Sequence, residues 1–239
     1  MKKQKELTPV CLCGYADEKG NIVIPLTWED ADYFSEGLAG VQDSKGNWGF
    51  IDETGKLVIP CRWDEVKEFR DGFGEVMKID KDGNKRWCHI DKSGKRLTPC
   101  KWSFVKFFSE GFAAVQDTDK KWGFIDRTGK LVIPCQFALV WDFHEGMAII
   151  EDSEGKCGFI DAMGKVVIPC QYYQAEHFSE GLALVKGPNK NYGFVDKTGQ
   201  VVIPFEWDNA HSFKNGLADV WDADDKWWCQ IDKTGKRVD

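Results

Sequence analysis

Cysteine is the most reactive residue type in this chain, because nine thiols could bind a metal or form disulfides. Four of them directly follow a recurring proline: Cys61, Cys100, Cys135 and Cys170. Leu26 and Phe205 fill the same place after other prolines, and no Cys-x2-Cys pair is present. A position shared by Cys, Leu and Phe is a packing position. We therefore predict unpaired structural thiols, with a metal or redox role as the alternative.

Recurring aspartates are the second group that could carry chemistry. An Asp-x-x-Gly segment begins at Asp17, Asp52, Asp91, Asp126, Asp161, Asp196 and Asp232. A calcium loop needs several oxygen ligands close together, whereas each of these segments supplies one. An Asp that accepts the amide hydrogen two residues later caps a type I turn, and a left-handed Gly completes a three-residue hairpin. We predict seven hairpin turns and no metal.

The four histidines, His89, His144, His177 and His211, each occur once at their place in the sequence pattern. Catalytic Ser/His/Asp or Cys/His groups assemble in space, so such a site between distant segments stays open as an alternative. The chain contains no phosphate-binding P-loop and no dinucleotide fingerprint. We therefore predict no catalytic residue and no cofactor, and expect that the chain is not an enzyme.

All these positions belong to one internal repeat. One proline recurs in every repeat and serves as its reference position, the ruler proline. It lies at Pro25, Pro60, Pro99, Pro134, Pro169 and Pro204, with spacings of 35, 39, 35, 35 and 35 residues. A phenylalanine lies three residues before each of six recurring glycines, at Phe34, Phe69, Phe108, Phe143, Phe178 and Phe213. Strict recurrence at fixed places predicts that these rings are buried, since packing fixes residue type.

The residue pattern of each repeat predicts three short strands, such as residues 37–41, 48–52 and 57–61. No segment shows the periodicity of a helix. The proline in the third strand predicts a sheet edge, and its apolar LVIPC pattern predicts burial on both faces. The expected units lie near 10–43, 44–78, 79–117, 118–152, 153–187 and 188–222, with a C-terminal cap at 223–239. We expect an all-β, open superhelical array of about six repeats; a closed six-bladed ring resembling a propeller is the alternative.

Two segments, NWGFIDETGKLVIP at 47–60 and KWGFIDRTGKLVIP at 121–134, with FSEGLAGV at 34–41, make the chain similar to the WG-repeat (KWG-repeat) family. The similarity covers nearly the whole chain. Local departures are Tyr192 and Cys157 in place of Trp, and Cys88 and Cys229 in place of Gly. The resemblance implies a β-rich array used for interaction, with no shared chemistry and no catalytic residue to carry over.

Charge and hydropathy limit the classes of partner and the cellular location that we expect. The net charge is −7, and basic residues occur singly among acids, so nucleic acid and anionic membranes are not expected partners. The N-terminus lacks an apolar signal segment, and no stretch approaches the roughly 18 apolar residues of a membrane span. Together with unpaired thiols, this predicts a cytoplasmic protein; a mature fragment whose leader was removed is the alternative.

Partner specificity should lie where the repeats differ, above all between the aromatic residue after the proline and the recurring Phe. The candidate ligand-binding residues are Phe107, Trp141, Tyr173, His177, Trp221 and Trp227. Aromatic residues exposed together mark interaction sites. Alternatively, these side chains pack between repeats, and Trp221 and Trp227 cap the last one. We expect a scaffold that binds a protein or peptide, with glycan binding as the alternative.

Overall fold

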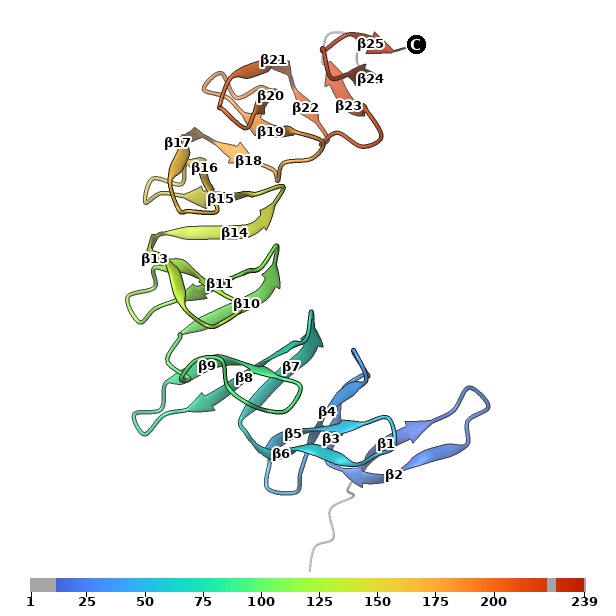
Figure 1. Cartoon of the computed structure of the whole chain (residues 1–239). Coiled ribbons are helices and arrows are strands. Elements are labelled where there is room, and N and C mark those ends of the chain that lie inside the picture. Colours follow the sequence, from blue (N-terminus) through green and yellow to red (C-terminus); the bar gives the residue numbers. More distant parts are fainter. Residues whose placement is uncertain (1–11, 223–226, 239) are drawn as a thin grey trace, which may run out of the picture. The chain divides into compact units, whose positions relative to one another are not determined.

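The structure, a computed structural model, describes residues 12–222 and 227–238 (Figure 1). Within these residues all regular secondary structure is β-strand, which confirms the all-β prediction. None of the described segments is a helix of the length and hydrophobicity needed to cross a membrane. The chain divides into two compact units, up to Phe107 and from Phe108 onward. Residues 10, 11, 223–226 and 239 of the predicted units lie outside the described residues.

The first unit contains three sheets with antiparallel neighbours. One sheet pairs β1 (Cys13–Ala16) with β2 (Ile22–Trp28). The next has the order β3 (Asp30–Ala31), β4 (Leu38–Gln42), β5 (Trp48–Asp52) and β6 (Leu57–Trp63). The third has the order β7 (Glu65–Arg70), β8 (Phe73–Ile79) and β9 (Lys85–Asp91).

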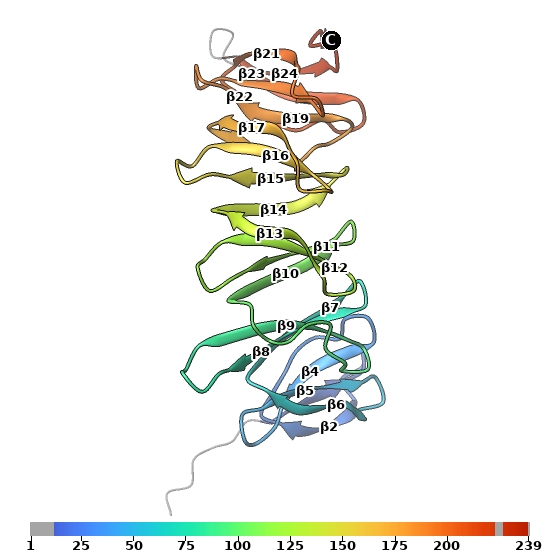
Figure 2. The same cartoon turned by 60° about the vertical axis from the view of Figure 1, so that its left-hand side comes forward.

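The second unit begins within β10 (Phe104–Ser109) and continues through β11 (Phe112–Gln116), β12 (Trp122–Asp126) and β13 (Leu131–Phe137). The following sheet has β14 (Leu139–His144), β15 (Met147–Glu151), β16 (Cys157–Asp161) and β17 (Val166–Tyr172). Next come β18 (Gln174–Ala175), β19 (Leu182–Lys186), β20 (Tyr192–Asp196) and β21 (Val201–Trp207). The last sheet has β22 (Asn209–Ala210), β23 (Leu217–Asp222), β24 (Trp227–Asp232) and β25 (Arg237–Val238). Within the second unit, Figure 2 shows these four sheets following one another in chain order.

Each complete sheet therefore contains the three predicted strands and a fourth, formed by the variable stretch before the recurring Phe. β14 is six residues long, whereas β18 and β22 have two residues each. A small apolar residue recurs six residues after each proline, at Ala31, Val66, Val105, Val140, Ala175 and Ala210. It anchors the short strands, as in the pairing of Ala210 with Val220. From β3 onward, each sheet begins just after the aromatic residue that follows the proline, so the sheets divide the chain at other points than the predicted units.

The turns fold as predicted. Oδ1 of Asp126 accepts hydrogen bonds from the amides of Thr128, at 2.8 Å, and Lys130, at 3.1 Å. Gly129 closes the turn with φ of 83°, in the region that side chains disfavour. All seven Asp-x-x-Gly glycines share this conformation, with φ between 79° and 88°.

The Gly of the Trp-Gly pair is required by a close approach of the third strand. A Cβ on Gly123 would lie 2.4 Å from the carbonyl oxygen of Ile133, and one on Gly49 would lie 2.5 Å from that of Ile59. Where Cys88 takes this place, the following segment forms only isolated bridges, Trp87 with Trp102 and Ile90 with Arg96, and no regular third strand.

Cys88 and Cys100 form a disulfide, so the prediction of unpaired thiols is wrong for these two residues. The reason is that the glycine place and the place after the proline face each other. A Cβ on Gly49, for example, would lie 2.9 Å from Sγ of Cys61. Cys88 and Cys100 put cysteine at both facing places of one repeat. The expectation of a cytoplasmic protein rested in part on unpaired thiols, and these two cysteines do not support it.

The core lies between successive sheets of each unit. The recurring Phe packs its ring against the Phe of the preceding Trp-Gly-Phe segment, with Phe143 and Phe124 centroids 4.9 Å apart. Phe69, Phe108, Phe143, Phe178 and Phe213 are at most 4% exposed, and Phe34 is half-buried. The predicted burial of these rings is therefore confirmed.

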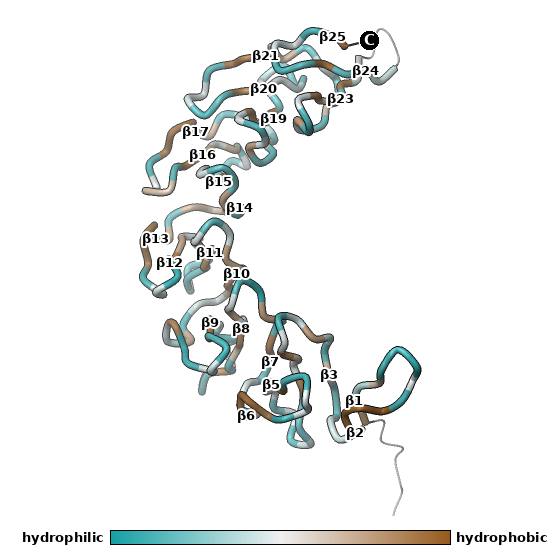
Figure 3. Tube along the Cα trace, turned by 45° about the vertical axis from the view of Figure 1, so that its right-hand side comes forward, coloured by the Kyte–Doolittle hydropathy of each residue, from teal (hydrophilic) through white to brown (hydrophobic). Residues whose placement is uncertain are grey.

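The third strand is only partly buried, whereas its apolar pattern predicts burial on both faces. In β6, Val58 and Ile59 pack with one core cluster and Cys61 packs against another. β6, β13 and β17 each begin with three aliphatic residues, the brown segments in Figure 3. Yet Leu57 is 41% exposed, while Ile59 is buried beneath the next turn, 3.1 Å from the Cβ position of Gly94. The strand lies at the edge of its sheet, as its proline predicts, and the Leu57 side chain is exposed.

The last sheet is polar where the sheet before it is apolar. Leu184 and Phe194 of the preceding sheet pack in the core. Asp219 and Gln230 hold the same places in the last sheet, are exposed, and are joined by a 3.1 Å hydrogen bond. Polar residues on the outer face of a terminal sheet act as a cap in repeat arrays.

Candidate functional site

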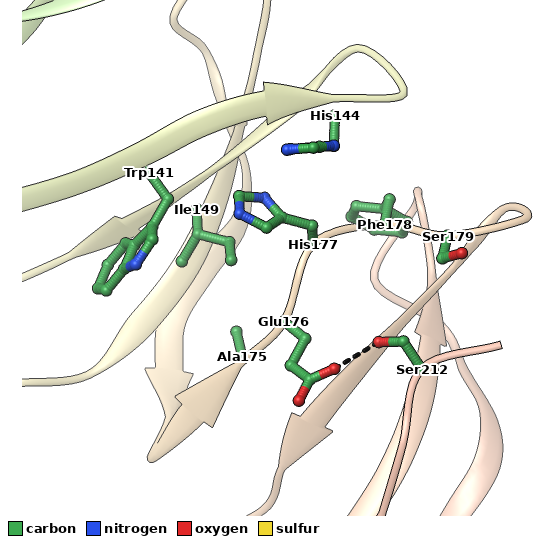
Figure 4. Close-up of a pocket in the computed structure, with 9 residues that line it drawn as sticks. All are labelled: Trp141, His144, Ile149, Ala175, Glu176, His177, Phe178, Ser179 and Ser212. Atoms are coloured by element: carbon green, nitrogen blue, oxygen red, sulfur yellow. Dashed lines mark hydrogen bonds between the residues drawn. The ribbon is translucent and has the colours of Figure 1, made fainter. Parts of the chain in front are cut away.

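Two of the six predicted site residues lie together, in a pocket of about 400 Å³ in the second unit (Figure 4). Trp141 is half-buried on β14, and His177 is half-buried in the segment between β18 and β19. The other lining residues are His144, Ile149, Ala175, Glu176, Phe178, Ser179 and Ser212. Trp141 packs against the hydrophobic core around Ile149 and Phe178, which holds the indole in place at the pocket wall.

Two imidazole rings form part of the wall. The centroids of His144 and His177 are 4.0 Å apart, with a tilt of 45° between the ring planes. His144 takes the place that Ser109 and Ser179 hold in their repeats. Those serine hydroxyls donate to the carbonyl oxygens of Phe143 and Phe213 in the following sheets. The exchange of Ser for His replaces a structural hydrogen bond with an exposed ring.

Glu176 is held in a defined orientation. Its amide donates to the carbonyl oxygen of Leu184 at 2.9 Å, which fixes the backbone. The hydroxyl of Ser212 donates to Oε2 at 2.5 Å, the contact drawn in Figure 4. The side chain is exposed, so this carboxylate reaches solvent while one of its oxygens is fixed.

A second pocket, of about 380 Å³, shares Ala175 and Glu176 with the first. Its other lining residues are Gln174, Leu184, Tyr192, Asn209, Ala210 and His211. The Tyr192 hydroxyl donates to Oε1 of Gln174 at 2.6 Å, which orients both side chains. We call the two pockets together the Glu176 groove.

The groove runs along one place in the repeat. Trp141, Glu176 and His211 each lie seven residues after the ruler proline of their repeat. Sequence analysis selected Trp141 and missed Glu176, His211, His144, Tyr192 and Ser212. The signal that could have found Glu176 and His211 is their equivalence to Trp141, because equivalent positions of stacked repeats lie side by side.

The remaining predicted residues lie elsewhere. Phe107, in the first unit, is half-buried, and its ring contacts Lys67 and Arg70 of the same chain at 5.8 and 5.3 Å. Tyr173 is 44% exposed, with Nζ of Lys156 3.0 Å from its ring centroid. The side chains of these residues already contact cations of this chain.

The two C-terminal tryptophans belong to the last sheet. Trp221 is half-buried, and its ring lies 5.8 Å from that of Trp228, which in turn lies 5.0 Å from His211. Trp227 is 58% exposed. An aromatic cluster therefore extends from the groove residue His211 to β23 and β24.

The first unit contains a buried polar cluster. Glu75 and His89 face each other on β8 and β9, with at most 1% of either residue exposed. Nζ of Lys67 lies 2.5 Å from Oε2 of Glu75 and 4.8 Å from the ring centroids of both Trp87 and Phe104. The cluster is an internal ammonium–carboxylate pair lined by aromatic rings.

Burial lowers the pKa of His89 to about 4, and the nearby Lys67 charge acts in the same direction. The 3.0 Å contact of its Nε2 with the carbonyl oxygen of Lys106 opposes this effect. His89 is therefore neutral at neutral pH, with Nε2 as the donor to that carbonyl.

The arrangement around Glu176 differs from a nucleophilic site. A hydroxyl has one hydrogen, and that of Ser212 is donated to the Glu176 carboxylate, so no imidazole accepts it as a general base would. Across residues 12–222 and 227–238, His, Cys, Asp and Glu form no group of three or more placed to hold a metal ion. The groups that the groove offers to a ligand are aromatic rings, the Glu176 carboxylate and amide side chains, and these are groups that bind a ligand.

In a comparison with known protein families, the model of the family described as "WG containing repeat" matches this chain. It matches six segments, residues 14–46, 48–81, 90–122, 122–157, 158–186 and 192–227. Among curated proteins none matches this chain.

Several solved structures are similar at low identity. The computationally designed Ika8 protein has a TM-score of 0.44 and 15% identity, covering 90% of this chain and 75% of its own. BamB from Moraxella catarrhalis has a TM-score of 0.42 and 10% identity, covering 88% and 75%. The WD40 beta propeller domain of Doa1 has a TM-score of 0.34 and 15% identity, covering 81% and 75%.

Proposed function

Because the chain belongs to the WG-containing repeat family, we propose that it is a non-catalytic scaffold that binds a protein or peptide partner through the Glu176 groove. The observation that carries this proposal is the position of Trp141, a half-buried indole in the wall of a pocket. Equivalent places in other repeats hold charged residues such as Asp32, Lys67 and Lys106. Trp is enriched among the residues that dominate binding energy at interfaces.

The contrast between recurring core residues and variable groove residues supports the same proposal. Residues that pack between sheets recur in type, as the buried Phe143, Phe178 and Phe213 do. Residues along the groove change from repeat to repeat: Trp141, Glu176 and His211. A fixed core with variable groove residues is the arrangement by which repeat proteins vary their partners without changing fold.

The experiment is quantitative capture of partners from a lysate by immobilised wild-type protein, Trp141→Ala and Trp227→Ala, read by mass spectrometry. Trp227→Ala is the matched control, since it removes an exposed Trp outside the groove. We expect a partner that the wild type and Trp227→Ala retain and Trp141→Ala loses. Equal capture by Trp141→Ala would place the binding surface outside the groove.

Glycan binding is the second candidate function. The second pocket puts the ring of Tyr192 beside the amide side chains of Gln174 and Asn209, and its polar groups are of the kind that hydrogen-bond sugar hydroxyls. A glycan array tests this candidate directly. Selective retention of one glycan class, lost in Tyr192→Ala, would favour it over a peptide partner.

A further inference from the structure

We propose that the Glu176 groove takes an extended peptide segment with a lysine or arginine side chain, whose cationic group binds the carboxylate of Glu176. This inference rests on the proposed function, because it names the chemistry of the partner that the same groove would bind.

Charge is the first argument. Glu176 lines both pockets, and no Lys, Arg or Asp lines either of them. The chain as a whole carries a net charge of −7. A carboxylate at the centre of such a groove attracts a cationic group and repels an anionic one. A cationic donor forms a charge-assisted hydrogen bond with it, which is stronger than one between neutral groups.

The orientation of Glu176 is the second argument. The Ser212 hydroxyl and the Leu184 carbonyl hold its side chain and backbone before any ligand binds. Within the described residues, Oε1 of Glu176 receives no hydrogen bond, whereas Oε2 does. A carboxylate that is already oriented and has one unused oxygen loses little conformational freedom when a donor arrives.

The aromatic lining is the third argument. Trp141 lines the first pocket and Tyr192 the second, so each pocket that Glu176 lines also contains an aromatic ring. Cations bind aromatic faces within about 6 Å of the ring centroid, and the effect adds to an ion pair. The groove therefore combines the two features that bind an ammonium or guanidinium group.

The chain already uses this combination internally. Lys67 pairs with Glu75 and lies 4.8 Å from the rings of Trp87 and Phe104. Lys67 holds the same place in its repeat as Trp141 and Glu176 do in theirs. In the second repeat the chain thus supplies its own cation, whereas at the Glu176 groove that place carries a ring and a carboxylate, and the cation must come from a partner.

The shared Glu176 fixes the form of the ligand. The two pockets belong to successive sheets, and packed sheets lie about 10 Å apart. An extended chain advances about 3.3 Å per residue, so about three residues pass from one pocket to the next. A short extended segment therefore spans the groove with one basic side chain at its centre.

The experiment uses an array of synthetic heptapeptides with basic, acidic and neutral central residues, probed with the full chain. Retained peptides are then titrated by fluorescence anisotropy against wild type, Glu176→Gln and Glu206→Gln. Gln at position 176 keeps an oxygen for Ser212, and Glu206 is an exposed acid outside both pockets. Thermal unfolding checks that both variants fold.

We expect the retained peptides to be enriched in central Lys or Arg. Replacing that residue with acetyl-lysine or citrulline, which are uncharged, should weaken binding at least about tenfold, as should Glu176→Gln. Glu206→Gln should bind as the wild type does, and the affinity should fall as salt rises.

The outcomes separate this inference from the function on which it rests. If peptides bind without any preference for a basic residue, or if Glu176→Gln binds as the wild type does, the cationic ligand is wrong and peptide binding stands. If the array retains no peptide and a glycan array retains a ligand, the peptide-binding function itself is wrong.

Discussion

Oε2 of Glu145 accepts a hydrogen bond from the amide of Gly181, 36 residues later, at 3.0 Å. The same contact joins Glu180 to Gly216 and Glu36 to Gly72. Glu145 adopts φ of 52°, a left-handed conformation that costs a residue with a Cβ about 1–2 kcal/mol. A strained residue that recurs at the same place in successive repeats has a structural role. Here it ties one sheet to the next within a unit.

The first prediction concerns this inter-sheet contact. Glu145→Ala removes the acceptor for Gly181 and the partner of Lys197, whose Nζ lies 3.2 Å from the carboxylate. Because the contact is near the surface, we expect a loss of about 1 kcal/mol in the free energy of unfolding, measured with urea. Glu154→Ala, at an exposed turn, is the control and should change stability by less than about 0.5 kcal/mol. Equal effects of the two variants would contradict the structural role of Glu145.

The second prediction concerns the left-handed turns. Gly129 has φ of 83°, so Gly129→Ala should destabilise the chain by more than about 1 kcal/mol. Thermal unfolding measures the effect. Thr128→Ala, in the same turn, removes a side-chain hydrogen bond to Asp126 without changing the backbone preference and should be milder. An Ala at 129 that is as stable as Gly would show that the turn relaxes.

The third prediction concerns the Gly of the Trp-Gly pair. A Cβ at position 123 would lie 2.4 Å from the Ile133 carbonyl oxygen and 2.7 Å from the Cys135 nitrogen, both backbone atoms. Gly123→Ala must therefore push β13 away from β12, at a cost of about 1–3 kcal/mol. Hydrogen exchange of the β13 amides should also accelerate. Unchanged exchange would mean that the strands do not approach as closely as the structure has them.

The fourth prediction tests the buried Phe layer. Phe143 is 1% exposed and packs against Phe124 and Phe112. Phe143→Ala should lower the free energy of unfolding by about 3–5 kcal/mol, because it leaves a cavity between two sheets. Tyr33→Ala removes a ring that is 95% exposed and should cost less than about 0.5 kcal/mol.

Residues that do one job in every repeat could be predicted from the sequence. The packing of Phe143 and the turn at Gly129 recur six and seven times, so their places identify their roles. The fourth strand could not be predicted, because β14 and its equivalents keep only the small residue and the Phe and show no shared alternation. Prediction of the disulfide would have required knowing that the places of Cys88 and Cys100 face each other.

The groove was only partly predictable for a related reason. Trp141 stood out by its type, whereas Glu176 is an ordinary surface residue until the neighbouring sheets place it between two pockets. Ser212, one repeat further on, gives Glu176 its orientation, and a pattern within a single repeat contains no trace of that contact.

The last prediction concerns pH and His89. Burial lowers the pKa of this residue to about 4 in the folded chain, against about 6.5 in an unfolded one. At a pH between these two values, His89 is therefore protonated in the unfolded state and neutral in the folded state. Stability is complete above about pH 6.5 and falls as the pH drops toward 4, below which both states are protonated. The total loss is about 3 kcal/mol, since each pKa unit is worth about 1.4 kcal/mol.

Urea unfolding at pH 7.5 and pH 4.5 measures this loss, and the variant His89→Gln isolates it from the carboxylates that titrate nearby. Gln is the residue that holds the equivalent place at Gln230, it can donate to the Lys106 carbonyl as His89 does, and it does not titrate. We expect the wild type to lose about 2–3 kcal/mol more than His89→Gln between the two pH values. Parallel pH curves for the wild type and His89→Gln would mean that His89 is protonated without unfolding, and that the buried cluster opens to water.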